Sequence, residues 1–293
     1  MDRSPVHPVV SHGHATDAKA DLTIGQLLLD AGKLKLHDAE RILKVQREQH
    51  LRFGEAAVRL GLVTETDIQK VLAQQFDYPY LADGQGNFSR ELVAAYLPFS
   101  AAVEVLRALR MQLLLRWFNL GHKALAITGP EGGEGASHLA ANLAVVFSQL
   151  GEKTLLIDAD LREPRQHRLF SLGESRGLSD MIAGRVGLDA IKPIDAFVSL
   201  SVLAAGTPAP NPAELLSRPT FGQLLADLAQ RFDVVLIDTH SGRPPADFQA
   251  VVAHAEGALI VARRHQTRLS QITVIKEAVV TTGAEVVGAV VVG

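Results

Sequence analysis

The chain of 293 residues contains no cysteine, few aromatic residues and no long apolar run. Without cysteine it forms no disulfide, thiolate metal site or cysteine nucleophile. No apolar run reaches the roughly 18 residues of a membrane helix, and the N-terminus lacks the apolar core of a signal peptide. A net charge of −3 gives no bulk attraction to nucleic acid. We therefore expect a soluble cytoplasmic protein that does not bind nucleic acid.

The length and composition predict more than one domain. Apolar residues make up 47% of the chain, enough for a substantial core, and the length exceeds one average domain. The first residues are rich in Pro, His and Ser and have no periodicity. We expect four segments: a disordered tail (1–20), a helical repeat module (21–80), a linker (81–100) and an α/β domain (101–293).

The helical module contains an internal repeat. IGQLLLDAGKLKLHDAERILKVQ (24–46) aligns with FGEAAVRLGLVTETDIQKVLAQQ (53–75), and each matched pair lies 29 positions apart, as from 24 to 53. Each copy predicts a short helix, a glycine cap (Gly32 or Gly61) and a second, amphipathic helix. Thr64, followed by an acidic residue three positions later, fits a capping box. The two copies are expected to pack face to face as a small helical domain.

This repeat resembles the N-terminal domain of type II secretion and pilus ATPases in its cyclic di-GMP-binding form. That form carries two Arg-Leu-Gly-led motifs separated by five residues, and the segment REQHL (47–51) has that length. The second motif opens on Arg-Phe-Gly (52–54), whereas the first opens on Thr-Ile-Gly (23–25) and lacks the arginine. The alternative is a docking module whose glycines are helix caps. The cyclic di-GMP site that the resemblance implies consists of Gly25, Gly32, Arg52, Gly54 and Gly61.

The segment AAVEVLRALRMQLLLRWF (101–118) has helical periodicity. Glu104, Arg107 and Arg110 lie three positions apart, so we expect one charged stripe. A solvated helix face would explain this stripe. However, Glu-x-x-Arg-x-x-Arg shortly before a nucleotide-binding strand resembles the subunit-contact helix of bacterial tyrosine kinases. That resemblance implies a homo-oligomeric ring held by these three residues.

From residue 122 onward, apolar runs alternate with helical patterns. KALAIT (123–128), KTLLIDAD (153–160), FDVVLIDTHSG (232–242) and GALIVARR (257–264) are predicted strands, and VVGAVVVG ends the chain. Continuous apolar strands interleaved with helices predict a parallel sheet with helices on both faces. The predicted fold class is α/β: a P-loop NTPase-like parallel sheet, preceded by a small helical repeat domain.

The first strand is followed by GPEGGEGASHLAAN (129–142), which is typical of a phosphate-binding loop that opens a helix. Its glycines let consecutive amides point inward, and the helix N-terminus adds partial positive charge. Ser137 can offer its hydroxyl to a magnesium ion. In the pattern G-x-x-x-x-G-K-[ST], the first glycine falls on Pro130 and the lysine on Ala136.

Carboxylates follow the predicted strands. Asp158 and Asp160 end the second apolar run, and Asp238 ends the third. Alternate strand residues face the same side, and ligands of open α/β sheets bind at the carboxyl edge of the strands. Three aspartates converging beside a phosphate loop predict a site for a magnesium-bound nucleotide.

Three segments together resemble the catalytic core of bacterial tyrosine kinases, which are relatives of the ParA and MinD ATPases. They are ITGPEGGEGASHLAANLAVVFSQLGEKTLLIDADLREPRQHRLF, LAAGTPAPNPAELLSRP (203–219) and FDVVLIDTHSG. Over roughly residues 21 to 293, the chain is most similar to EpsG-type chain-length-determinant kinases of exopolysaccharide clusters. By this resemblance, Asp158 holds Mg²⁺, Asp160 is the base on the tyrosine hydroxyl, and Asp238 supports the metal.

The resemblance further makes Ser137 a metal-ligating hydroxyl and ATP with Mg²⁺ the cofactors. It implies a partner, an inner-membrane polysaccharide chain-length protein, through which the chain would lie at the inner membrane. The nucleotide-binding set that it implies is Gly132, Gly133, Glu134, Gly135, Ala136, Ser137, His138 and Arg162.

The sequence departs from the family at two places. Ala136 stands where the phosphate-binding lysine is expected, and losing one preorganised donor to a transition state typically costs about 10²–10³ in rate. Arg162, Arg263, Arg264 or an arginine of a neighbouring subunit could substitute. The last residues, Val-Val-Val-Gly, carry no tyrosine-rich tail, so the expected self-targets are the only three tyrosines, Tyr78, Tyr80 and Tyr96.

These features leave three hypotheses. The first is an ATP-dependent tyrosine kinase that phosphorylates itself or a polysaccharide protein. The second is a catalytically impaired, nucleotide-binding regulatory subunit of a polysaccharide co-polymerase, with a response to cyclic di-GMP as an open alternative within it. The third is a positioning ATPase of the ParA/MinD type, against which stands the lack of an early loop lysine in Gly-Pro-Glu-Gly (129–132).

Overall fold

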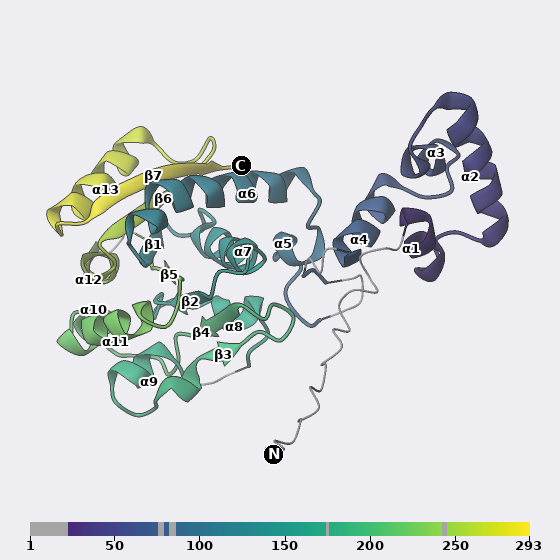
Figure 1. Ribbon diagram of the computed structural model, residues 1–293. Helices are drawn as coiled ribbons and strands as arrows, with labels where there is room; N and C mark the ends of the chain where they lie inside the picture. The colour runs from purple at the N-terminus through teal and green to yellow at the C-terminus, as the bar shows by residue number, and fades with distance from the viewer. Residues whose placement is uncertain (1–22, 76–78, 82–85, 174–175, 242–244) are drawn as a thin grey trace, which may run out of the picture. The chain divides into compact units, whose positions relative to one another are not determined.

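The computed structural model describes residues 23–75, 79–81, 86–173, 176–241 and 245–293. The chain divides between Pro79 and Tyr80 into two compact units, called unit 1 and unit 2 below (Figure 1). The predicted tail (1–20) and Tyr78 lie outside the described residues. Within the described ranges, no helix is long and apolar enough to cross a membrane.

Unit 1 contains two helix pairs of the same design. Its helices are α1 (Ile24–Asp30), α2 (Leu36–Gln49), α3 (Phe53–Arg59) and α4 (Glu65–Gln75). The starts of α1 and α3, and of α2 and α4, are each 29 positions apart (24 to 53 and 36 to 65), as in the sequence repeat. The core obeys the same offset, since buried Leu28 matches Ala57 and buried Ile42 matches Val71.

Local geometry accounts for the glycines of unit 1. Gly32 and Gly61 both have φ +66° just past the ends of α1 and α3, where only glycine adopts the left-handed conformation without strain. Gly25 and Gly54 lie at close helix contacts. A Cβ on Gly25 would be 3.1 Å from the Phe53 ring, and one on Gly54 would be 3.4 Å from Ile68. All four glycines therefore have a role in folding.

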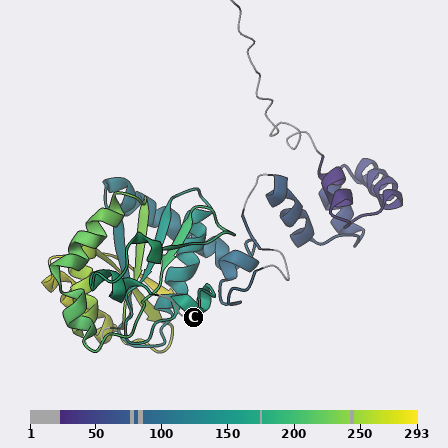
Figure 2. The ribbon, with the colours of Figure 1, turned by 90° about the horizontal axis from the view of Figure 1, so that it is seen from below.

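Unit 2 is built on one seven-stranded sheet in the order β3-β4-β2-β5-β1-β6-β7 (Figures 1 and 2). All neighbouring strands pair in parallel except β3, which is antiparallel to β4. The predicted parallel sheet is confirmed apart from β3, and the sequence patterns missed both β3 and β4. The strands are β1 (Ala124–Thr128), β2 (Thr154–Asp158), β3 (Lys192–Pro193), β4 (Leu200–Leu203), β5 (Val234–Asp238), β6 (Gly257–Arg263) and β7 (Glu285–Val292).

Helices cover both faces of this sheet, as the two views show (Figures 1 and 2). The apolar clusters place α5 to α8 on one face and α9 to α13 on the other. The 3-10 turns are η1 (Phe118–Leu120) and η2 (Leu188–Ala190). The helices are α5 (Val93–Tyr96), α6 (Ala101–Arg116), α7 (Ala136–Ser148), α8 (Gln166–Leu169), α9 (Leu178–Ile182), α10 (Pro212–Leu216), α11 (Pro219–Ala229), α12 (Pro245–Ala255) and α13 (Leu269–Thr281).

The segment predicted as a linker is part of the sheet domain over its described residues 86–100. Leu92, Ala94 and Ala95 are fully buried. The Ala94 amide donates to the Asn142 side chain on α7 at 2.9 Å. Tyr96 is also buried and donates its hydroxyl to the Phe88 carbonyl, so it is a poor acceptor for phosphate.

The charged stripe predicted on α6 is wrong for one of its three members. Glu104 is exposed and forms an ion pair with Arg107. Arg110, in contrast, is buried, and its guanidinium donates to the Val146 carbonyl of α7. The three-residue spacing places all three side chains on neighbouring positions of the helix, but Arg110 lies on the side that packs against α7.

Candidate functional site

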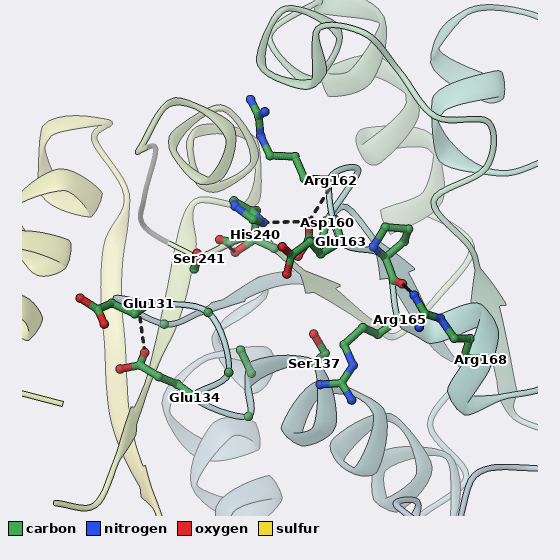
Figure 3. A pocket seen from close by; sticks show the side chains of 17 residues that line it. Glu131, Glu134, Ser137, Asp160, Arg162, Glu163, Arg165, Arg168, His240 and Ser241 are labelled. Carbon is green, nitrogen blue, oxygen red and sulfur yellow. Dashed lines mark hydrogen bonds and ion pairs between the residues drawn. The ribbon is translucent and has the colours of Figure 1, made fainter. Parts of the chain in front are cut away.

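A cleft of about 540 Å³ opens at the carboxyl edge of the sheet. Three segments line it: the glycine loop after β1, the loop after β2 and the loop after β5 (Figure 3). The strands β1, β2 and β5 are neighbours in the sheet, which is why these loops meet. This is the edge at which ligands of open α/β sheets bind.

The glycine loop uses left-handed backbone at two of its glycines. Gly133 has φ +83°, and Gly135 has φ +91° as the residue before α7. A Cβ on Gly129 would lie 2.5 Å from the Glu134 carboxylate and 3.1 Å from the Val261 carbonyl, so a larger residue there would displace Glu134. Glu134 is buried and accepts hydrogen bonds from the Glu131 amide and the Thr267 hydroxyl. The loop is thereby closed around its own glutamate, with its backbone bordering the cleft.

Two buried carboxylates lie beneath the cleft. Asp158 and Asp238 end neighbouring strands in direct register and are both fully buried. Gln166 links them: its backbone amide donates to Asp158 at 2.9 Å, and its side-chain amide donates to Asp238 at 2.8 Å. The same side chain donates to the Ser137 carbonyl at 3.0 Å, which ties the start of α7 to the carboxylates.

Each of these carboxylates keeps one oxygen without a hydrogen bond. Among the described residues, Oδ1 of Asp158 and Oδ1 of Asp238 are buried with no partner, as is Oε1 of Gln166. Burial raises the pKa of Asp158 well above its ordinary value, and the neighbouring Asp238 raises it further. Burial also raises the pKa of Asp238 to about 7, although Gln166, Ser137 and Arg165 act in the opposite direction. The pair is therefore short of positive charge.

These residues fit a divalent cation. Unpaired carboxylate oxygens beside a serine hydroxyl are the donor set of Mg²⁺, which is usually held by one or two carboxylates together with water and substrate phosphates. Ser137 lines the cleft, whereas both aspartates lie under it. No cluster of three or more His, Asp or Glu side chains able to hold a metal alone exists in the described part of the chain. Ser137, Asp158 and Asp238 thus suit a metal that arrives with a nucleotide.

The third predicted aspartate, Asp160, has a different environment. It lines the cleft, and its Oδ1 accepts hydrogen bonds from the Arg162 and Glu163 amides and from His240 at 2.9 Å. Burial alone would raise the pKa of Asp160, but these hydrogen bonds outweigh it and lower the pKa. The same contact raises the pKa of His240. Asp160 is therefore ionised at neutral pH.

Three arginines line the cleft, and they differ in what holds them (Figure 3). Arg162 forms a two-pronged ion pair with Asp247 of α12, whose carboxylate is almost completely buried. Arg168 donates to the Pro164 carbonyl at 3.4 Å. Arg165 donates from its backbone to Asp158 and from its side chain to Glu91 at 3.4 Å. Outside this set, Arg263 donates to the Gly133 carbonyl of the glycine loop at 3.1 Å.

The structure brings together most of the residues that the sequence singled out. The loop residues Gly132–Ser137, Asp160 and Arg162 line the cleft, and His138 does not. Sequence reasoning missed three contributors, Gln166, Arg165 and the His240–Asp160 contact. Their positions in the sequence could have identified them. Arg165 and Gln166 directly follow DADLREP, and His240 stands two residues after Asp238.

Comparisons with known proteins agree with this architecture. No family model matches the chain. The tyrosine-protein kinase YwqD of Bacillus subtilis is 35% identical over 201 residues, which cover 69% of this chain and 85% of YwqD. The tyrosine-protein kinase wzc of Salmonella typhimurium is 34% identical over 182 residues, 62% of this chain and 25% of that protein.

A solved structure extends this likeness to the fold. The kinase domain of the Escherichia coli tyrosine kinase ETK aligns with a TM-score of 0.68 and 29% identity, covering 74% of this chain and 86% of that domain. The chain thus spans most of YwqD and a quarter of wzc. With this identity and coverage of YwqD, the chain belongs to the bacterial tyrosine-protein kinase family.

Proposed function

We propose that the chain binds Mg²⁺-ATP in the cleft of unit 2 and transfers the γ-phosphoryl group to a tyrosine hydroxyl. The observation that carries this proposal is the pair of unpaired, buried oxygens on Asp158 and Asp238 beside Ser137 and the glycine loop. Such an arrangement is costly in a folded protein unless a cation satisfies it. Membership of the tyrosine-protein kinase family supports phosphoryl transfer as the reaction.

The residues have separate tasks in this proposal. The amides of the glycine loop and the N-terminus of α7 bind the phosphates. Ser137, Asp158 and Asp238 hold Mg²⁺, which when bound neutralises charge on the phosphate oxygens. Gln166 fixes both carboxylates and the start of α7 in position.

Asp160 is the proposed base. The tyrosine oxygen attacks the γ-phosphorus, ADP leaves, and the hydroxyl proton passes to the Asp160 carboxylate. Its hydrogen bonds within the described residues all go to Oδ1, which leaves Oδ2 to accept from a substrate hydroxyl. His240 holds the carboxylate in place through Nδ1. The lowered pKa of Asp160 keeps this group ionised before the substrate arrives.

Asp160→Asn tests this assignment. We expect phosphotyrosine formation to fall by about 10²–10⁴-fold, the usual contribution of a general base, while Mg²⁺-ATP binding persists. Asp227→Asn is the matched control. Asp227 is exposed on α11, so this substitution removes the same charge away from the cleft. Phosphotyrosine formation on the chain and on a tyrosine-containing polymer would be measured. Equal rates for Asp160→Asn and wild type would refute the role of Asp160.

We further propose that the protein regulates the chain length and export of an exopolysaccharide with an inner-membrane chain-length protein, which would hold it at that membrane as a ring-forming subunit. The sequence resemblance to EpsG-type kinases supports this setting. Exposed Glu104 and the exposed apolar residues Val105, Met111 and Leu115 of α6 support self-association. Glu104→Lys should shift the sedimentation coefficient toward the monomer, and an unchanged profile would remove α6 from the interface.

A second candidate function follows from Ala136. With no lysine in the glycine loop, the chain would bind nucleotide and act as a regulatory subunit without transferring phosphate. The phosphotyrosine assay separates the two functions, because the regulator binds Mg²⁺-ATP and yields no phosphotyrosine with any partner or polymer. Restoring the lysine by Ala136→Lys should then switch phosphotyrosine formation on.

A further inference from the structure

The glycine loop lacks its usual cation, yet the cleft that it borders does not lack positive charge. Ala136 opens α7 where a lysine would reach the phosphates. Arginines from the loop after β2 line the same cleft (Figure 3). One of them, Arg165, immediately precedes α8. We propose that Arg165 is the phosphate-binding cation of this site and replaces the missing lysine from the opposite wall of the cleft. This inference rests on the proposed function.

The position of Arg165 is fixed by the carboxylates under the cleft. Its backbone amide donates to Asp158 at 3.0 Å, so its Cα is held beside the proposed metal site. Its side chain extends into the cleft toward Ser137 at the start of α7 (Figure 3). Burial raises the pKa of Asp238, and the positive charge of Arg165 acts in the opposite direction. Arg165 therefore points at the place where a serine-bound metal and its phosphates would lie.

Among the other arginines near the cleft, Arg162 and Arg263 are committed to protein groups, while Arg168 donates to the Pro164 carbonyl at 3.4 Å. Arg162 is clamped by both oxygens of a buried carboxylate, Asp247. Arg263 donates to the Gly133 carbonyl and so supports the loop itself. Arg165 has a weaker commitment, since its side-chain contact with Glu91 is 3.4 Å long and both side chains are about half exposed, 47% and 51%. Exposed pairs of this kind contribute little, so a phosphate can displace Glu91.

Guanidinium chemistry suits this task. Arginine presents a planar fork of donors that binds two phosphate oxygens at once, and it stays charged at any physiological pH. A lysine at position 136 would move with α7, whereas Arg165 belongs to the loop after β2, which also carries Asp160. The cation and the proposed base thus come from one segment of six residues, Asp160 to Arg165.

The test is a double-mutant cycle between positions 165 and 136. Binding of a non-hydrolysable ATP analogue with Mg²⁺ would be measured by calorimetry for wild type, Arg165→Ala, Ala136→Lys and the double variant. We expect Arg165→Ala to weaken binding roughly ten- to hundredfold, the range of one charge-assisted hydrogen bond. Ala136→Lys should restore most of that loss, and its gain should be larger in the Arg165→Ala background than in wild type, because both cations would serve the same phosphates.

Two further variants control for charge and fold. Arg231→Ala removes one positive charge at the amino end of β5, away from the cleft, and should bind like wild type. Arg165→Lys keeps the charge without the fork and should bind between wild type and Arg165→Ala. Thermal unfolding without nucleotide would check that each variant is folded.

The outcomes separate this inference from the proposed function. No binding by wild type would refute the proposed function and this inference with it. Binding by wild type that Arg165→Ala retains in full would refute the role of Arg165 alone. Equal gains from Ala136→Lys in both backgrounds would also refute it, because the two positions would then act independently.

Discussion

The two units differ in how far folding alone explains their unusual residues. In unit 1, Gly32 and Gly61 are left-handed helix caps, and Gly25 and Gly54 make room for Phe53 and Ile68. Among the described residues of unit 1, no buried polar side-chain atom lacks a partner. In unit 2, by contrast, the carboxylates of Asp158 and Asp238 keep buried oxygens that nothing in the described chain satisfies.

This difference distinguishes residues that serve the fold from residues that serve a ligand. A glycine with a packing reason needs no further function, whereas an unsatisfied buried charge lowers stability and persists where a ligand completes it. By this standard the proposed site for a cation and a nucleotide lies in unit 2. The cyclic di-GMP set that the resemblance implies in unit 1 includes Arg52. It is the one member of that set whose side chain has no packing or capping role in the described structure.

The two units can be followed separately in one experiment. The chain has a single tryptophan, Trp117, which lies buried in unit 2 and donates its ring N–H to the Ala124 carbonyl. Tryptophan fluorescence therefore reports the unfolding of unit 2, while far-ultraviolet circular dichroism reports the helices of both units. The predictions below use this separation.

The largest expected effect is that one substitution at Asp158 changes stability and nucleotide binding in opposite directions. Asp158→Asn should raise the stability of the nucleotide-free unit 2, because it removes one of two buried carboxylates that repel each other. The same change should weaken Mg²⁺-dependent nucleotide binding by at least about 10–100-fold, the usual cost of disturbing a metal site. Trp117 fluorescence in denaturant and calorimetry would measure the two effects. Lower stability together with unchanged binding would contradict the account.

The next effect is a pH dependence of the stability of unit 2 between about pH 4 and pH 7. The folded pKa of Asp238 is raised to about 7, so the folded state binds more protons than the unfolded state between about pH 4 and pH 7. The free energy of unfolding without metal should therefore fall as pH rises through this window, by about 1–4 kcal/mol. Asp238→Asn should flatten that slope. A stability that rises from pH 5 to pH 7 in wild type and falls in the variant would contradict the prediction.

A smaller effect is expected in unit 1. Gly61→Ala places a Cβ on a residue with φ +66°, which costs about 1–2 kcal/mol although no atom lies in the way. The helical transition seen by circular dichroism should move to lower denaturant, while the Trp117 transition and Mg²⁺-ATP binding stay unchanged. Gly32→Ala is the matched variant in the other repeat and should behave alike. A loss of nucleotide binding in either would break the separation between the units.

The smallest effect is expected for Arg52→Ala. The Arg52 side chain is not used by the fold of unit 1, since α3 is capped through the Arg52 amide, which donates to Glu55 at 2.9 Å. Stability should change by less than about 0.5 kcal/mol, as for other surface substitutions. If unit 1 binds cyclic di-GMP, as its sequence resemblance implies, calorimetry should show that Arg52→Ala loses this binding. Equal binding by variant and wild type would remove Arg52 from the site.

Much of the architecture could be predicted because it depends on local patterns. The repeat fixed the helix pairs of unit 1, since caps and apolar spacing are local properties. The long apolar runs predicted β1, β2, β5, β6 and β7. The run around Leu200–Leu203 was missed because four residues give too little periodicity to separate a strand from a loop.

The contacts that refine the site could not be predicted, because they join distant segments. His240 meets Asp160 from 80 positions away, and Arg162 meets Asp247 from 85. The burial of Arg110 against the Val146 carbonyl depends on how α6 packs on α7, which three-residue spacing does not specify. Spacing identifies which residues share a helix face or a sheet edge. Which of them become partners depends on the packing of the elements.

The central claim is that unit 2 binds a magnesium-bound nucleotide without a lysine in its glycine loop. The most direct measurement is a calorimetric titration of the full chain with a non-hydrolysable ATP analogue, with and without Mg²⁺. The account predicts binding that requires Mg²⁺ in wild type, because Ser137, Asp158 and Asp238 would hold the phosphates through the metal. No binding at millimolar concentrations of the analogue, or equal binding without Mg²⁺, would contradict it.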